Sequence, residues 1–133
     1  MTYRGIENFF GNVWKFVDGI NINDNVPYVS NTDTDFADDT ATDYTDLGIT
    51  LPNTDGYQKT LEQQSRGFLP ASVGGTGVGS STYITDYYYQ STDWRVALLG
   101  GSASYGAYAG VACWSLSYSS SIDVMNIGAR LAY

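Results

Sequence analysis

The sequence predicts a single α+β domain that is poor in helix and built from short strands joined by long loops. Its 133 residues suit one domain, and a chain of that length buries roughly two thirds of its unfolded surface. The chain contains 15 Gly and 12 Tyr, and this composition favours strands and loops over a helix bundle. Several segments alternate apolar and polar residues with a period of two, and none shows a heptad or an internal repeat.

The N-terminal segment predicts one short helical turn and one bent strand. Residues 6–10 are compatible with a helical turn that ends at Gly11. From there Trp14 and Phe16 share one face, and Val17 belongs to the other. The alternation resumes after Gly19, so we expect a strand that is bent or bulged near Asp18–Gly19.

The middle of the chain predicts a long irregular excursion over residues 23–56, which is rich in Asp, Asn and Thr. Its expected anchors to the body are its few large apolar side chains, Phe36, Tyr44, Leu47, Ile49 and Leu51. A second short helix is expected over residues 58–64, followed by a buried Phe68 and Leu69. Residues 73–81 read VGGTGVGSS, which is typical of a flexible Gly/Ser loop and lacks the Lys of a phosphate-binding loop.

The C-terminal third predicts three strands. Trp94, Val96 and Leu98 alternate with their neighbours up to Gly100–Gly101. In the second strand, Trp114 falls on the same face as Ala112 and Leu116, whereas Ser115 falls on the face of Cys113 and Ser117. We expect the Trp114 face to be buried and the small polar face to point to solvent. Residues 126–133 form the closing strand.

Charge and composition exclude several function classes. The net charge is −8, which disfavours nucleic acid and anionic membranes as partners. No apolar run approaches the ~20 residues that a membrane-spanning helix requires, and the N-terminus has no signal-peptide pattern. The chain has no His and a single Cys, which removes the commonest general base and any internal disulfide. We therefore predict that the protein is not an enzyme and binds no cofactor or metal.

Three chemical alternatives remain open. Asp33, Asp35, Asp38 and Asp39 could supply oxygens to calcium, but their spacing is not that of an EF-hand, and a solvated acidic loop is favoured. Two of Asp18, Asp86 and Asp93 could form the carboxylate pair of a carbohydrate-active enzyme, although Asp is commoner in turns. Cys113 has no His to activate it, which favours a small, inert structural residue.

Residues 100–124, GGSASYGAYAGVACWSLSYSSSIDV, use an unusually narrow alphabet. They contain no Lys, Arg, Glu, Gln, His or Asn. Tyr offers large contact area at low entropic cost, and Ser and Gly adapt their hydrogen bonding, as in antibody loops. Composition alone leaves two interpretations open, a binding surface and an exposed sheet edge.

Two segments together resemble a known family. GNVWKFVDG resembles the GNVWEW-type motif of the formylglycine-generating-enzyme-like branch of the C-type lectin fold, and WRVALLGGSAS with NIGARLAY resembles that branch's RGGSW and closing GFR motifs. With LGITLPNTDGY, YITDYYYQSTDWRVALLGG and AGVACWSLSYSSSIDVMNIGARL, essentially the whole chain is similar to the variable proteins of diversity-generating retroelements of gut phages and related bacterial elements. The catalytic relatives need two active-site cysteines and this chain has one, so the resemblance implies the fold without that activity.

The resemblance also accounts for the narrow alphabet. In this family a reverse transcriptase misreads template adenines, so Asn codons are scattered over many residues but never to Lys, Glu, Gln, Trp or Met. Trp114 and Met125 should therefore belong to a fixed scaffold around a hypervariable segment of about residues 102–124, and Trp114→Ala should cost far more stability than changes at Ser115 or Tyr118. The resemblance assigns further residues to this scaffold: Gly101, Gly106, Gly110, Leu116, Gly128 and Arg130. The positions that the resemblance implies to be varied and to bind ligand are Ser102, Ser104, Tyr105, Tyr108, Ser115, Ser117, Tyr118, Ser119, Ile122, Asp123 and Val124.

The implied function is recognition of a ligand through a hypervariable surface. The setting implied is a receptor-binding protein of a phage virion, at the tail or surface, or a bacterial cell-surface protein. Its partner would be a protein or glycan on a bacterial surface. Family members usually carry N-terminal regions that attach or oligomerise them, so we expect a homo-oligomer formed through such a region. The alternatives are a structural or decoration module of a virion and the carbohydrate-active enzyme named above.

Overall fold

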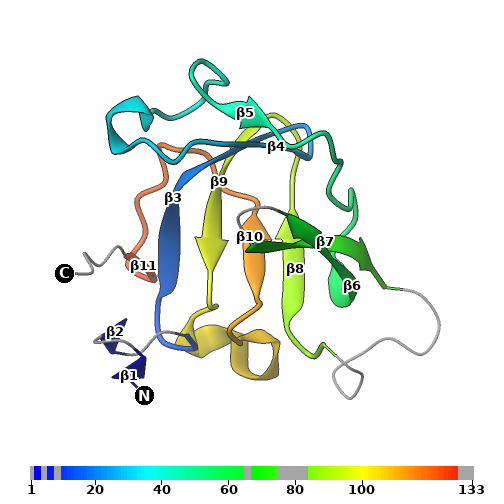
Figure 1. The fold of residues 1–133 in the computed structure, drawn as a ribbon. Helices are drawn as coiled ribbons and strands as arrows, with labels where there is room; N and C mark the ends of the chain where they lie inside the picture. The colour runs from blue at the N-terminus through cyan, green and yellow to red at the C-terminus, as the bar shows by residue number, and fades with distance from the viewer. Residues whose placement is uncertain (1, 4–5, 8–9, 65–66, 75–83, 129–133) are drawn as a thin grey trace.

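The computed structural model describes residues 2–3, 6–7, 10–64, 67–74 and 84–128 (Figure 1). Its strands are β1 (Thr2–Tyr3), β2 (Ile6–Glu7), β3 (Trp14–Asn23), β4 (Val26–Val29), β5 (Thr45–Asp46), β6 (Gly56–Gln64), β7 (Gly67–Val73), β8 (Tyr87–Gln90), β9 (Trp94–Leu99), β10 (Trp114–Leu116) and β11 (Ile127–Gly128). Two 3₁₀ helices, η1 (Asp33–Asp35) and η2 (Ala103–Tyr108), are the only helices in these ranges. The helix-poor, β-rich part of the predicted fold is therefore confirmed.

Nine of the strands in the described ranges form one curled sheet in the order β5-β4-β3-β9-β10-β8-β6-β7, with β11 paired to β3. The β10–β8 and β11–β3 pairs are parallel, and the other pairs of this sheet are antiparallel. β1 and β2 pair only with each other. β3 and β11 lie side by side, so strands from both ends of the chain meet in one sheet (Figure 1).

β3 is bent where the sequence predicts a bend. Its register against β9 shifts between Val17 and Asn21. Gly19 has a φ of +78°, and a Cβ on it would lie 2.8 Å from the Ser30 carbonyl oxygen and 2.9 Å from the Phe36 ring. Only glycine fits this close approach of the backbone, which explains the break in the alternation.

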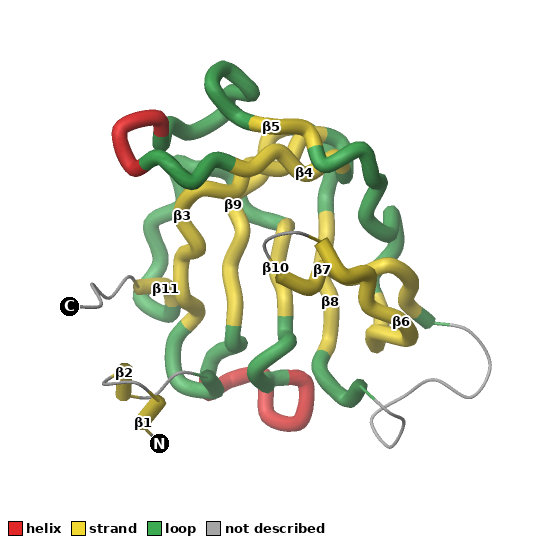
Figure 2. The backbone as a smooth tube through the Cα atoms, in the orientation of Figure 1, coloured by secondary structure: helices red, strands yellow, loops and turns green. Residues whose placement is uncertain are grey.

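Both faces of the sheet are covered. One face carries the first core cluster, Ile22, Leu51, Leu69, Tyr88, Ala97 and Leu116. The opposite face carries the second core cluster, Trp14, Val96, Leu98 and Cys113. The β6–β7 hairpin crosses in front of β10 and β8 and adds Leu69 to the first cluster (Figure 2). Because one core cluster lies on each face, the strands at the centre of the sheet carry apolar side chains on both faces.

Two helices expected from the sequence are wrong. Ile6–Glu7 is strand β2, and residues 58–64 lie inside β6, which pairs with both β7 and β8. QKTLEQQ is acceptable to a helix, but hairpin pairing satisfies its backbone groups and overrides that weak preference. The expected burial of Phe68 is also wrong, because its side chain is 60% exposed while Leu69 is 8% exposed.

The excursion over residues 23–56 is irregular apart from β4, η1 and β5. Leu51 is buried, and Leu47 and Ile49 pack against the first core cluster, as expected of anchors. Phe36 is a poor anchor at 40% exposure. The buried Asn21 amide instead ties the acidic loop to β3 by donating to the carbonyls of Ala37 at 2.6 Å and Thr40 at 3.0 Å. In the part of the chain that the structure describes, no helix has the length and apolarity to cross a membrane.

Candidate ligand-binding surface

Tyrosines from three elements gather at one end of the sheet. Tyr57 and Tyr87 are register partners on β6 and β8, and Tyr89 follows on the same face of β8. Tyr88 points to the opposite face, where it is fully buried in the first core cluster. Tyr105 and Tyr108 come from η2, which crosses this end of the sheet (Figure 1). We call Tyr57, Tyr87, Tyr89, Tyr105 and Tyr108 the tyrosine surface.

The rings of the tyrosine surface form a continuous chain of contacts. Tyr57 and Tyr87 meet edge-to-face with centroids 5.0 Å apart, and Tyr87 and Tyr108 do so at 5.2 Å. The ring centroids of Tyr87 and Tyr89 lie 4.6 Å apart, and those of Tyr89 and Tyr105 lie 5.4 Å apart. Edge-to-face pairs of this kind are favourable beyond the area they bury, so the rings hold one another in place.

The inner end of this chain rests on the second core cluster. Trp14 is fully buried and packs edge-to-face on Tyr105, with centroids 5.3 Å apart, and on Tyr89 at 6.3 Å. Burial raises the pKa of Tyr89 and of Tyr105, and the charge and side-chain hydrogen bond of Tyr118 raise that of Tyr105 further. A phenol with its ordinary pKa is already neutral at physiological pH, and these shifts keep both phenols neutral to higher pH. The opposite end of this chain of rings is accessible to solvent, since the Tyr108 side chain is 42% exposed.

Three glycines determine the path of η2 and its flanks. Gly101 has a φ of +71°, and a Cβ on it would lie 2.6 Å from that of Ala109. Gly106, inside η2, has a φ of +52° and non-helical geometry. A Cβ on Gly110 would overlap the Asp86 carboxylate, which accepts the Ala112 N–H at 2.7 Å. Each of these three expected scaffold glycines thus has a backbone or steric reason to be glycine.

Two of the predicted site residues do not lie on a surface. Ser102 and Ser115 are each only 2% exposed, so the expectation that they point to solvent is wrong. The alternation placed Ser115 on the correct face, because its register partners are Tyr89 and Leu98. That face is covered by η2 and by the segment after β10, so a small polar residue there is enclosed.

The expected burial of the Trp114 face is confirmed for Leu116, which is 1% exposed, and only in part for Trp114 itself. Trp114 is half-buried, whereas its neighbours Cys113, Ser115 and Leu116 are buried. Its ring packs at the edge of the first core cluster and lines a cavity of about 360 Å³ together with Val17, Leu69 and the exposed Phe68. Met125, expected in the scaffold, is completely exposed.

The remaining predicted residues fall into two groups. Ser104 lies on η2 with Tyr105 and Tyr108, and its hydroxyl is 3.0 Å from that of Ser102. Tyr118 packs on the second core cluster near Tyr105. By contrast, Ser119, Ile122, Asp123 and Val124 lie further along the segment between β10 and β11, which contacts the acidic loop through Ser120 and Asp39. The predicted residues of η2 and Tyr118 therefore lie together, and the predicted positions from Ser119 onward lie apart from them.

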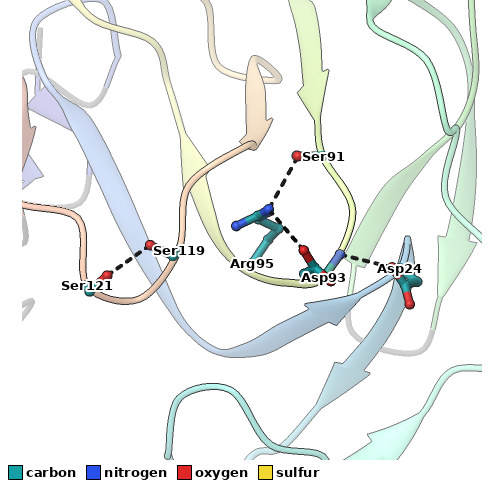
Figure 3. Close-up of polar contacts among 6 residues, drawn as sticks. All are labelled: Asp24, Ser91, Asp93, Arg95, Ser119 and Ser121. Carbon is teal, nitrogen blue, oxygen red and sulfur yellow. Dashed lines mark hydrogen bonds and ion pairs between the residues drawn. The ribbon is translucent and has the colours of Figure 1, made fainter.

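The separated segment has its own contacts. Ser119 and Ser121 hydroxyls lie 3.0 Å apart, and the Ser120 hydroxyl donates to the Asp39 carboxylate at 2.6 Å. Figure 3 shows the Ser119–Ser121 pair on the loop that follows β10. The Tyr118 carbonyl accepts the Val96 N–H at 3.0 Å, which fixes the start of this segment along β9. Ser117, half-buried, precedes it.

The sequence prediction missed Tyr57, Tyr87 and Tyr89. Their signal is present in TDGY and in the YYYQ run, whose period-two alternation places Tyr87 and Tyr89 on one face. What the sequence does not give is the pairing of β8 with β6 and β10, which brings that face against η2.

The geometry gives little support to the calcium site, the carboxylate pair or the reactive cysteine that the sequence left open. Among the described residues no group of three or more His, Cys, Asp or Glu could hold a metal ion. Asp86 and Asp93 flank opposite ends of β8, and both are used structurally: Asp86 accepts the Ala112 N–H, and Asp93 adopts a φ of +66° in the β8–β9 turn. Asp24 stabilises that turn by accepting the Asp93 N–H at 2.9 Å (Figure 3).

Cys113 is fully enclosed, and burial together with the charge of Asp86 raises its thiol pKa to about 12. A thiol that remains protonated and enclosed is a poor nucleophile. The Gly-rich residues 75–83 lie outside the described residues, and so do residues 129–133 of the closing strand expected from the sequence. No family model, no curated protein and no solved structure matches this chain.

Proposed function

We propose that this chain is a non-enzymatic ligand-recognition protein that binds through the tyrosine surface and the exposed residues of η2. The observation that carries the proposal is the continuous set of tyrosine rings contributed by β6, β8 and η2 and anchored on buried Trp14. Tyr supplies contact area with few rotatable bonds. Rings that already hold one another lose less entropy on binding, which leaves more of the contact energy as affinity.

The finer proposal is a C-type lectin fold of the formylglycine-generating-enzyme-like branch, with a surface diversified by a retroelement. A helix-poor curled sheet with long loops is compatible with it. The narrow alphabet of residues 100–124 and the structural reasons for Gly101, Gly106 and Gly110 support a division between exchangeable and fixed positions. Ser104, Tyr108, Asp123 and Val124 are exposed and can change without repacking.

The biological setting that we propose is a receptor-binding protein on a phage virion that contacts a protein or glycan on a bacterial surface. The net charge of −8 argues against nucleic acid as the ligand. Several copies on one particle would raise a weak single-site affinity by avidity.

Two matched display libraries test the proposal. One randomises exposed Ser104 and Tyr108 on η2 with codons derived from AAC, and the other randomises buried Ser102 and Ser115 in the same way. We expect the first library to remain folded and to yield clones that bind whole bacteria, and the second to be depleted of folded clones. If the two libraries tolerate substitution equally, or if the first yields no binder, the proposal is wrong.

A structural module of a virion is the second candidate. Val111, just after η2, is 55% exposed, and Tyr108 is 42% exposed, so a neighbouring subunit could cover this end of the molecule. Light scattering over a concentration series distinguishes the two. Self-association that Tyr108→Ser and Val111→Ser abolish would favour the module, whereas a monomer at all concentrations would exclude contact between copies through this surface.

A further inference from the structure

The cavity of about 360 Å³ beside Trp114 lies on the face of the sheet opposite the tyrosine surface. Trp114 is the register partner of Tyr88, which belongs to the first core cluster, whereas Ser115 pairs with Tyr89 of the tyrosine surface. Small-molecule sites in proteins are concave, mainly apolar and about 300–1,000 Å³ in volume. We call this space the apolar cavity, because most of its lining is apolar: Val17, Ile20, Val29, Leu47, Leu69 and Trp114.

Phe68 forms a solvent-exposed wall of the apolar cavity. Its side chain is 60% exposed, whereas that of Leu69 beside it is 8% exposed. Across the cavity lining, the half-buried Trp114 supplies a second aromatic ring. An apolar ligand group that fills the cavity would cover surface of both rings and remove it from water, which favours binding.

Two polar side chains without partners meet the apolar cavity at the bend of β3. The Ser30 N–H donates to the Gly19 carbonyl at 2.9 Å, which holds the bend against the end of β4. Asp18 precedes Gly19 and Asn31 follows Ser30, so both residues flank this backbone pair and both line the cavity. Both are exposed, and neither has a hydrogen-bond or ion-pair partner among the described residues. The Asp18 carboxylate and the Asn31 amide oxygen can therefore accept hydrogen bonds from a ligand.

The charge at the apolar cavity favours a cation over an anion. Asp18 contributes a carboxylate, and none of the described residues that line the cavity is Lys or Arg. The chain as a whole has a net charge of −8, which attracts cations and repels anions. A primary ammonium group has three hydrogen-bond donors and no acceptor, so it matches the two acceptors at the bend of β3.

We propose that the apolar cavity binds an arylalkylamine, that is, an aromatic ring on a short alkyl chain that ends in a primary ammonium group. The aromatic ring packs against Trp114, Leu69 and Phe68, since aromatic pairs are favourable beyond the area they bury. The ammonium group lies by Asp18 and Asn31. The cavity is separate from the tyrosine surface, so this inference goes beyond the proposed function and does not depend on it.

An NMR titration of the isotope-labelled full chain with 3-phenylpropylamine, 3-phenylpropan-1-ol and 3-phenylpropanoate tests the proposal. The three probes share one apolar body and end in a cation, a neutral group and an anion. We expect a saturable shift of the Trp114 indole N–H signal, which Trp114→Phe identifies by its loss. The amine should bind roughly two- to five-fold more tightly than the alcohol, as an exposed ion pair predicts, and the carboxylate should bind most weakly. No saturable shift of this signal, or equal affinities for the amine and the alcohol, would overturn the proposal.

Asp18→Asn tests the contact with the ammonium group. It should weaken binding of the amine by roughly two- to five-fold and leave binding of the alcohol nearly unchanged. The matched control is Asp123→Asn, which changes the net charge equally at an exposed position between β10 and β11, outside the lining of the cavity. Equal losses in the two variants would indicate general attraction of cations to an acidic protein and would contradict the site.

Phe68→Ser tests the apolar contact. Because this side chain is 60% exposed, the substitution should leave the fold intact. It should weaken binding of the amine and of the alcohol alike, by roughly five-fold or more, since both lose the same apolar contact. Val111→Ser is the matched control, because Val111 is 55% exposed and does not line the cavity. If Val111→Ser weakens binding as much as Phe68→Ser does, the ligand is not in the apolar cavity and the proposal is wrong.

Discussion

Ser115 shows how one residue can be placed on the correct face and still have the wrong environment. It is 2% exposed between its register partners Tyr89 and Leu98. We expect Ser115→Tyr to lower the free energy of unfolding by roughly 1–3 kcal/mol, because the added ring has to displace η2 or the segment after β10. Ser104→Tyr, on exposed η2, should change it by about 0.5 kcal/mol or less. Urea unfolding of both variants measures this, and equal stabilities would contradict the burial of Ser115.

Cys113 gives a prediction for alkaline pH. Its thiol pKa rises from 9.0 to about 12 on folding, chiefly because of burial. The folded state then holds a proton that the unfolded state loses above about pH 9, so stability falls as pH rises, by at most about 1.4 kcal/mol per pH unit for this group. Cys113→Ala should flatten the onset of this fall, between about pH 8 and 9, where tyrosines of the unfolded chain, with a pKa of 10.0, are still almost fully protonated. Urea unfolding across this range tests it, and an unchanged slope would exclude Cys113 as its source.

At the scale of elements, η2 depends on the contact between Gly110 and Asp86. The Asp86 carboxylate occupies the space that a Cβ on residue 110 would need, and it accepts the Ala112 N–H at 2.7 Å. We expect Gly110→Ala to cost roughly 1–3 kcal/mol of stability through this overlap. Adding Asp86→Gly should recover part of the loss, because it removes the clashing group. A double-mutant cycle measures the coupling, and strictly additive losses would show that the two residues do not share this space.

At the scale of the whole molecule, two tryptophans separate the buried centre from its margin. Trp14 is fully buried and joins β3 to the β9 core and the tyrosine surface. Trp14→Ala should cost roughly 3–5 kcal/mol, as large truncations in a core do. Trp114→Ala should cost about 1–2 kcal/mol, since its half-buried ring loses less contact. Thermal unfolding of both variants tests this ranking. A larger loss of stability for Trp114→Ala than for Trp14→Ala would show that Trp114 is the central core residue, as the sequence indicated.

Much of the fold could be predicted from local patterns. The bend of β3 at Gly19, strand β9 with its stop at Gly100, and the anchoring of Leu47, Ile49 and Leu51 all follow from alternation, glycine and apolar spacing. The helices over residues 6–10 and 58–64 failed because short polar segments carry no strong periodicity, and pairing with a distant strand decides their conformation. The candidate site was predicted in part: Tyr105 and Tyr108 lie on the tyrosine surface, while Tyr57, Tyr87 and Tyr89 come from segments that only the sheet brings close.

The sequence by itself determined the β-rich composition, the acidic charge, the two faces of its central strands and the glycines that shape η2. Only the tertiary structure decided which of those faces reaches solvent, because exposure depends on what other parts of the chain lay over a strand. Alternation assigns Ser115 and Trp114 to opposite sides of β10, but η2 and the β10–β11 segment cover the first, and the β6–β7 hairpin leaves the second partly open. The physical reason is that side-chain direction is a local property of the backbone, whereas burial is a property of the whole packed chain.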